Sequence, residues 1–138
     1  MALSRDRVIR LKALVTRQEY KLAADAVIHH HALVAVNADG YLVPAADAAG
    51  QRVVGIASEA MSNTGGQDGE RAIVVYKGAA RLPTTGANPV TQASVGRRAY
   101  VLDDEHVVAS GTSQSIDAGE VLEVDEHGDG FAWVNVGV

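Results

Sequence analysis

Short runs of β-prone residues, separated by turn-forming residues, recur along most of the chain. The segment ALVAVNADGYLVPAADAAGQRVVGIA, residues 32–57, shows this pattern most clearly, with apolar runs on both sides of Asn37-Ala38-Asp39-Gly40. Asparagine, aspartate and glycine accept the backbone geometry of tight turns between antiparallel strands. The segment therefore predicts β-hairpins.

Eight such runs predict strands. They lie at residues 32–36, 41–43, 53–57, 72–76, 99–102, 106–109, 121–124 and 131–136. Clusters rich in glycine and aspartate separate them, and no segment between them has the sustained apolar stripe and caps of a helix. Many short strands of this kind predict an all-β fold, a small β-barrel or sandwich. We find no convincing internal repeat. The segments expected as surface loops are residues 58–69, 83–94 and 110–119, which could form contacts at one rim of a barrel.

The N-terminal segment has a different pattern. Its alternate apolar residues are Ile9, Leu11, Ala13 and Val15. This alternation fits a strand, although the spacing of Val8, Leu11 and Val15 also fits one face of a helix. We expect an extended arm that is partly ordered, and only with a partner. The expected organisation is a basic arm, residues 1–25, followed by one β-rich domain, residues 26–138.

Charge divides the chain in the same place. Residues 1–21 carry six basic and two acidic side chains, a net charge of +4, and the remaining residues carry a net charge of −9. An acidic body should repel nucleic acid, so we expect no nucleic-acid partner. The basic arm suits an acidic protein surface, although nucleic acid or solvent could also face it.

Composition narrows the possible functions further. The chain has no cysteine, which excludes disulfides and thiolate metal sites. No apolar stretch approaches the roughly 20 residues of a membrane-spanning helix, and Arg5, Arg7 and Arg10 interrupt any signal-peptide core. No nucleophile motif of the Gly-x-Ser-x-Gly type occurs. We expect a protein that is not an enzyme, has no cofactor and does not associate with membranes.

Three polar clusters invite a functional interpretation. In a strand, His29 and His31 would share one face, but a zinc site needs at least three converging protein ligands, so we expect a polar strand start or interface patch and no metal site. The glycine-rich segment at residues 65–69 lacks the Lys-Ser/Thr pair and the helix of a phosphate-binding loop. The carboxylates of residues 103–105 are consecutive rather than alternate, which indicates a hairpin turn instead of a calcium loop. We expect Phe131 and Trp133 to be core or subunit contacts.

An ordered succession of motifs runs from about residue 22 to the C-terminus. The leading motifs are Leu33-Val34-Ala35-Val36, Asp39-Gly40-Tyr41-Leu42-Val43-Pro44-Ala45, Val53-Val54-Gly55-Ile56-Ala57 and Asn63-Thr64-Gly65-Gly66. The later ones are Tyr76-Lys77-Gly78, Val95-Gly96, Ala99-Tyr100-Val101, Asp103-Asp104, Asp125-Glu126-His127-Gly128 and Trp133-Val134. In this order they resemble the head decoration, or capsid cement, proteins of tailed phages and prophages.

The resemblance implies a non-enzymatic virion protein that binds the outside of the head and stabilises it. Proteins of this family are compact and β-rich, often form trimers, and sit where subunits of the major capsid protein meet. Their N-terminal arm commonly pairs with capsid strands, a mode of binding in which an extended segment is added to a sheet. The expected location is the capsid surface, and the cytoplasm of the bacterial host before assembly.

We therefore expect two partners, the shell of major capsid protein and further copies of this chain in a homotrimer. The candidate contact residues are Arg7, Ile9, Arg10, Leu11, Lys12, Ala13 and Val15. The apolar members would contact the shell, and the basic members would meet its acidic groups. The alternative is a small β-barrel binding module, for a glycan or as a fibre or adaptor component of a virion. An enzyme that uses the histidine cluster is a third hypothesis.

Overall fold

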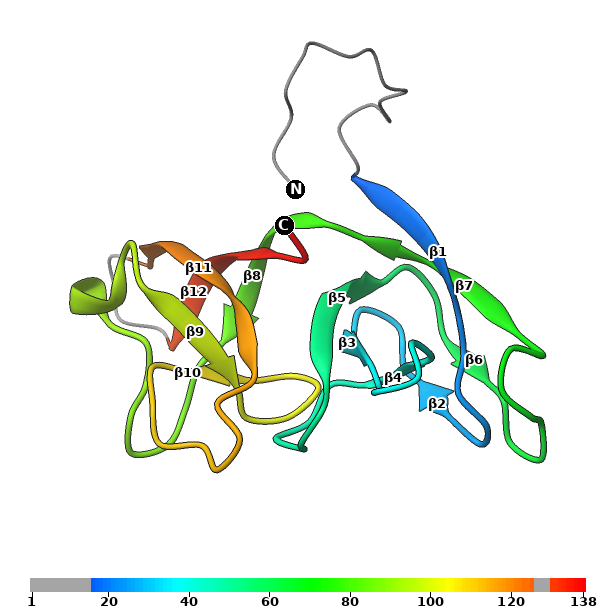
Figure 1. Ribbon diagram of the computed structural model, residues 1–138. Coiled ribbons are helices and arrows are strands. Elements are labelled where there is room, and N and C mark those ends of the chain that lie inside the picture. Colours follow the sequence, from blue (N-terminus) through cyan, green and yellow to red (C-terminus); the bar gives the residue numbers. More distant parts are fainter. Residues whose placement is uncertain (1–15, 126–129) are drawn as a thin grey trace, which may run out of the picture.

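The computed structural model describes residues 16–125 and 130–138 and confirms the expected all-β class. Two five-stranded antiparallel sheets, each strongly curled, lie next to each other, and a sheet of two short strands flanks the first (Figure 1). The only helical element in the described residues is a single 3-10 turn, Gln92–Ser94. Hydrogen bonding between strands therefore organises the described fold.

The first sheet has the strand order β1-β7-β5-β3-β4. Its strands are β1 (Arg17–Lys21), β3 (Leu33–Val36), β4 (Leu42–Pro44), β5 (Arg52–Ala57) and β7 (Ala72–Tyr76). The sheet curls until its ends meet, because Leu22 forms a parallel bridge with Leu42 and the N–H of Ala23 donates to the Leu42 carbonyl at 2.9 Å. The short strands β2 (Val27–Ile28) and β6 (Met61–Ser62) pair with each other beside this curl.

The second sheet has the strand order β10-β9-β11-β12-β8. Its strands are β8 (Gly78–Pro83), β9 (Arg98–Val101), β10 (Val107–Val108), β11 (Asp117–Val124) and β12 (Phe131–Val136). It curls in the same way, with a parallel bridge between Thr84 and Val107. Only Lys77 separates β7 from β8, so one nearly continuous stretch of chain passes from the first sheet to the second (Figure 1).

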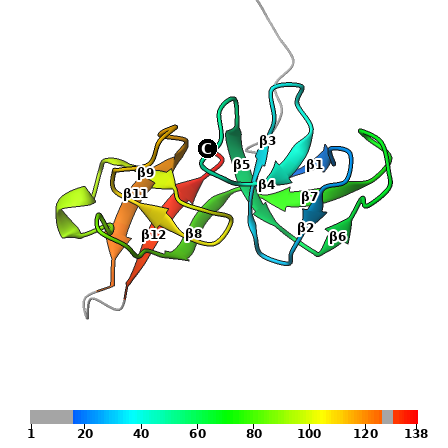
Figure 2. The same cartoon turned by 90° about the horizontal axis from the view of Figure 1, so that it is seen from below.

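The two sheets repeat one topology, which the sequence did not reveal. In each sheet the first strand in the chain pairs with the fifth, the fifth with the fourth, the fourth with the second, and the second with the third. The two bridges are equivalent as well, since each joins the residue after the first strand to the third strand. The expectation of no internal repeat is therefore wrong at the level of structure. Figure 2 shows the two halves side by side.

The repeat extends to the register of the strands. The ladder β3–β5 shifts between Val34 and Ala35, and the ladder β9–β11 shifts between Asp117 and Gly119. Each shift leaves one extra residue, which is the sign of a β-bulge. A glycine with positive φ follows the extra residue in both sheets, Gly55 with φ 153° and Gly119 with φ 139°. Sequence comparison misses this equivalence because few side chains coincide while the backbone does.

The two cores explain why β3 is apolar on both of its faces. Val34 and Val36 point into the curl of the first sheet, whereas Leu33 and Ala35 point to the other side and join the core of the second sheet. All four residues of β3 are consequently buried. In the second sheet the positions equivalent to Leu33 and Ala35 are Arg98 and Tyr100, which remain at least partly exposed. The outer face of the first sheet thus covers the open side of the second.

Each of the eight expected strands overlaps a strand of the structure. The sequence patterns missed β1, β2, β6 and β8, and residues 58–69 and 110–119, which we expected as loops, contain β6 and the start of β11. The expected arm also ends too late. Residues 17–21 form β1, and Leu22 and Ala23 are buried in the first core, because their apolar side chains close the curl against β4. The folded body therefore includes residues 17–25.

Candidate interaction surface

The arm joins the body through β1, at one end of the first sheet. Arg17, Glu19 and Lys21 are exposed, whereas Tyr20 lies against the first core. The ladder with β7 continues one residue beyond β1, because the N–H of Lys77 donates to the carbonyl of Thr16 at 2.8 Å. The chain upstream of Thr16 is therefore attached to the body beside the connection between the two sheets.

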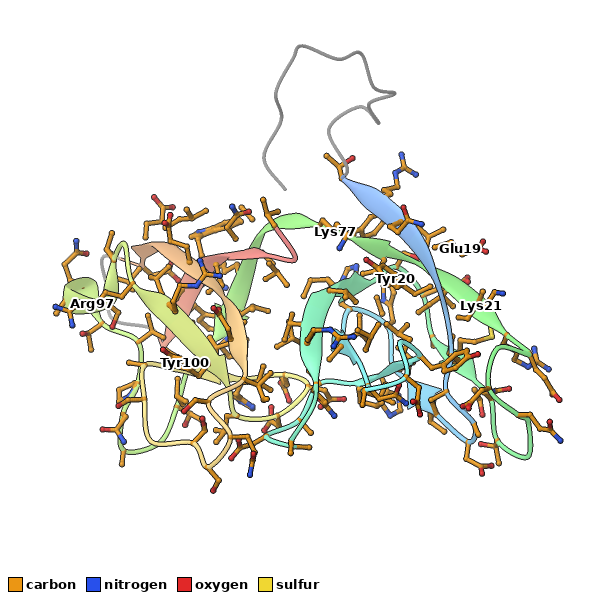
Figure 3. All side chains as sticks on the ribbon, in the orientation of Figure 1. Glu19, Tyr20, Lys21, Lys77, Arg97 and Tyr100 are labelled. Atoms are coloured by element: carbon orange, nitrogen blue, oxygen red, sulfur yellow. The ribbon has the colours of Figure 1, made fainter. Side chains whose placement is uncertain are left out.

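Lys77 links this attachment point to several parts of the body. Its Nζ donates to the carbonyl of Val54 at 2.9 Å and to that of Gly137 at 3.4 Å, and it lies 5.2 Å from the centre of the Tyr20 ring. These contacts tie β1, the bulge of β5 and the end of β12 together, and Figure 3 shows Lys77 beside Tyr20 on this side of the body. The carbonyl oxygens and the aromatic face replace the water that the Lys77 ammonium group loses, and so offset the cost of its partial burial.

The same side of the molecule exposes apolar surface. The C-terminus and the N-terminal end of β1 both lie here (Figure 1). Val138 is 72% exposed and Tyr76 is 42% exposed. Arg17 lies over the Tyr76 ring, with 6.0 Å between the guanidinium carbon and the ring centre. We call the exposed surface formed by Arg17, Tyr76 and Val138 the arm-exit face.

All candidate contact residues of the arm lie outside the described residues. They are Arg7, Ile9, Arg10, Leu11, Lys12, Ala13 and Val15. Their role as partner contacts therefore stays a prediction. The structure adds the place where that segment meets the body, which sequence patterns missed because β1, RQEYK, has only one strongly β-prone residue.

The histidine cluster lies in a turn rather than in a strand. Strand β2 ends at Ile28, and the three histidines that follow are exposed. His31 has a positive φ of 61°, and its ring stacks on that of His30 with 3.9 Å between the centres. The argument that His29 and His31 share a strand face therefore does not apply. Within the described residues no group of histidine, aspartate and glutamate side chains is placed to hold a metal ion.

The acidic segment after β9 forms the expected turn. The Asp103 carboxylate accepts hydrogen bonds from the N–H groups of Glu105 (2.9 Å) and His106 (2.7 Å) and lies 3.0 Å from His106 Nδ1. Partial burial acts to raise the pKa of Asp103, but these hydrogen bonds and the nearby imidazole outweigh it and hold the pKa below its ordinary value. The carboxylate of Asp103 therefore stabilises the turn by accepting hydrogen bonds from its backbone.

Phe131 and Trp133 lie on the outer face of the second sheet. Both are partly exposed and alternate along β12 with the buried residues Ala132 and Val134. The Arg81 guanidinium carbon is 3.9 Å from the centre of the Phe131 ring, and its Nη2 is 2.6 Å from Asp125 Oδ2. Of the two roles expected for these aromatic residues, a place in the core is excluded by this arrangement, while subunit contact stays a prediction.

Comparisons with protein-family models, curated proteins and solved structures gave no match to this chain. In the described ranges, 16–125 and 130–138, no helix has the length and hydropathy required to cross a bilayer. The functional argument therefore depends on the residues and their arrangement.

Proposed function

We propose that this protein is a non-enzymatic head decoration protein of a tailed phage or prophage. It would bind the outside of the capsid through its N-terminal arm and stabilise the shell. The resemblance of the ordered motifs suggested this function. The observation that best supports it combines the sequence of the arm, which is basic and alternately apolar, with the place where the described structure begins, at β1, a terminal strand of the first sheet.

The hydrogen-bonded attachment of the arm favours binding by strand addition. The chain leaves β1 at Thr16, whose carbonyl is fixed by Lys77, and Lys77 is itself held by two carbonyl oxygens. An arm held at its base loses less conformational entropy on docking than a freely pivoting one, which favours affinity. Added strands bind through backbone hydrogen bonds, while their alternate side chains enter pockets.

The opposite charges of the arm and the body also fit binding of the arm to the capsid. The positive arm would be drawn towards acidic groups of the shell, whereas the acidic body would stay on the outside. The arm-exit face adds exposed Tyr76 and Val138 next to the arm. In this proposal that face is turned towards the capsid, and each of the three chains of the homotrimer presents its own copy of it to the shell.

A glycan-binding module is the second candidate. A hollow of ≈ 440 Å³ beside the second sheet is lined by Phe131, Thr91, Gln92 and Asp125 among others. An aromatic ring beside hydrogen-bonding side chains suits a sugar. This candidate accounts for neither the arm nor its charge, so it ranks below capsid binding.

The proposal can be tested with the genome that carries the gene and with its particles. We expect genes for a head protease and a major capsid protein next to this gene, and purified protein should sediment with expanded heads assembled from that capsid protein. Failure to bind those heads, together with a clear hit in a glycan array, would support the second candidate instead.

A further inference from the structure

Strand β8 is bordered along its whole length by a groove. Two hollows, of ≈ 290 Å³ and ≈ 520 Å³, line it from Gly78 to Pro83. They share His31, Arg81 and Leu82 in their linings and are therefore adjacent to each other. The opposite wall comes from the first half of the chain, with Ile56 and Tyr76 near one end and His29 and His30 near the other. We call this feature the β8 groove.

The backbone of β8 has hydrogen-bonding capacity on the side away from β12. Strand β8 is at the end of the strand order and pairs only with β12 among the described strands. The N–H of Thr84 donates to the Gly130 carbonyl, so the alternation of an antiparallel ladder directs Leu82 and Ala80 to β12. The same alternation directs the N–H and carbonyl groups of Ala79 and Arg81 away from β12. An unpaired edge of this kind is a template for an added strand.

The charges of the β8 groove favour a basic occupant. Arg81 is paired with Asp125, and Lys77 is engaged with the carbonyls of Val54 and Gly137. Asp104 and Glu105 also line the groove, and neither forms a salt bridge with another described residue. The carboxylates of the groove are therefore the charges still open to a partner.

We propose that the β8 groove binds the N-terminal arm of its own chain, residues 1–15, as an added strand. The arm starts beside the groove, since Thr16 is hydrogen-bonded to Lys77, the residue just before β8. Fifteen extended residues span up to about 50 Å and the six residues of β8 about 20 Å, so the arm reaches the whole groove. Its alternate apolar residues would face the body, and its basic residues would approach Asp104 and Glu105.

The consequence is a competition for the arm. A segment tethered at the mouth of its site has a high effective concentration there and occupies it at any protein concentration. The arm would lie in the groove in free protein and would be released when another strand edge binds it more tightly. This inference goes beyond the proposed function, because it concerns the free protein and holds for any partner of the arm.

Hydrogen exchange of individual amides, measured by NMR on the full-length protein, tests this inference. The informative amides are those of Ala79 and Arg81, and those of Ala80 and Leu82 serve as internal references because they point to β12. We expect Ala79 and Arg81 to exchange at least tenfold more slowly in the natural protein than in a Leu11→Asp/Ala13→Asp variant. A matched Ala2→Asp/Ser4→Asp variant, which adds the same charge farther from the attachment point, should exchange like the natural protein.

Two results would overturn the inference. Equal exchange of Ala79 and Arg81 in the natural protein and in Leu11→Asp/Ala13→Asp would show that the arm does not cover this edge. Protection that disappears on dilution would assign the groove to the arm of a second copy. A further variant, Glu105→Lys, should speed exchange of Ala79 and Arg81, whereas the matched Glu123→Lys change outside the groove should not.

Discussion

Gly55 is held in a conformation and a space that other residues cannot share. Its φ is 153°, and a Cβ atom on it would lie 2.2 Å from the carbonyl oxygen of Tyr76. Gly119 repeats both features, with its Cβ position 2.2 Å from the carbonyl oxygen of Asn135. The two bulges of the repeated topology therefore depend on glycine, for the same steric reason, at equivalent positions.

We predict that Gly55→Ala lowers the free energy of unfolding by about 3 kcal/mol, because a strained φ and a backbone clash are combined. Gly40→Ala is the matched control, since Gly40 has φ 87° but open space around it, and it should cost only about 1 kcal/mol. Urea unfolding followed by the fluorescence of Trp133 measures both. Equal losses in the two variants would contradict the role given to the clash.

Asp103 makes one turn sensitive to acid. Its pKa is lowered in the folded protein, so the ionised carboxylate contributes stability above the unfolded pKa of about 3.9, and this contribution is lost as the pH falls through the lower folded value. We predict that Asp103→Asn is less stable than the natural protein by about 1 kcal/mol at pH 7. The difference should shrink below pH 4 in urea unfolding, and a difference that is constant from pH 7 to pH 3 would contradict this assignment.

At the scale of elements, a buried asparagine holds the small β2–β6 sheet over the first core. Asn63 is 2% exposed, and its side-chain amide donates to the carbonyls of Ala23 (2.8 Å) and Gln67 (3.0 Å). Removing the amide would leave two carbonyls short of partners in a buried place. The motif that contains Asn63 therefore has a structural role in this chain, whatever surface the neighbouring residues present.

We predict that Asn63→Ala costs about 2 kcal/mol of stability and speeds amide exchange in residues 22–28 before the rest of the body. Ser62→Ala is the matched control, because Ser62 is exposed and its hydroxyl interacts only with Thr64 among the described residues. Thermal unfolding and hydrogen exchange measure the two effects. Exchange that rises uniformly over the whole body would argue against a local role.

The sequence predicted the strands that are rich in β-prone side chains. It missed the strands that form because a partner distant in sequence pairs with them. Strands β7 and β12 were predicted with their observed bounds because β-branched and aromatic residues fill them. Strand β8, GAARLP, lacks β-branched residues and forms because β12 pairs with all six of its positions. The repeat was also invisible, since Leu33 and Arg98 hold equivalent positions in opposite environments.

The candidate interaction surface was only partly predictable. Alternation and charge pointed to the arm, but they could not locate its attachment beside Lys77, which arises from a contact between β1 and β7 that is distant in sequence. The notion that Phe131 and Trp133 belong to the core also came from residue type alone. In β12, Ala132 and Val134 point into the core, so the alternating residues Phe131 and Trp133 point to the outer face.

At the scale of the whole molecule, the proposed function predicts self-association. The chain mass is 14.4 kDa, and we expect light scattering of purified protein, or chemical cross-linking of protein bound to heads, to give three times that mass. The partly exposed aromatic residues of β12, Phe131 and Trp133, are candidate contacts between copies. Trp133→Glu should then reduce the trimer to a monomer that still unfolds cooperatively in urea, followed by circular dichroism because Trp133 is the only tryptophan. A protein that is monomeric both free and on heads would contradict this part of the account.

The most direct test of the central claim is removal of the arm at the boundary that the structure defines. Deletion of residues 1–21 would remove β1 and damage the body, whereas deletion of residues 1–15 leaves every described strand in place. The account predicts that the protein lacking residues 1–15 still unfolds in a single cooperative urea transition and no longer sediments with expanded heads that bind the full chain. Sedimentation of the shortened protein with those heads as complete as that of the full chain would contradict it.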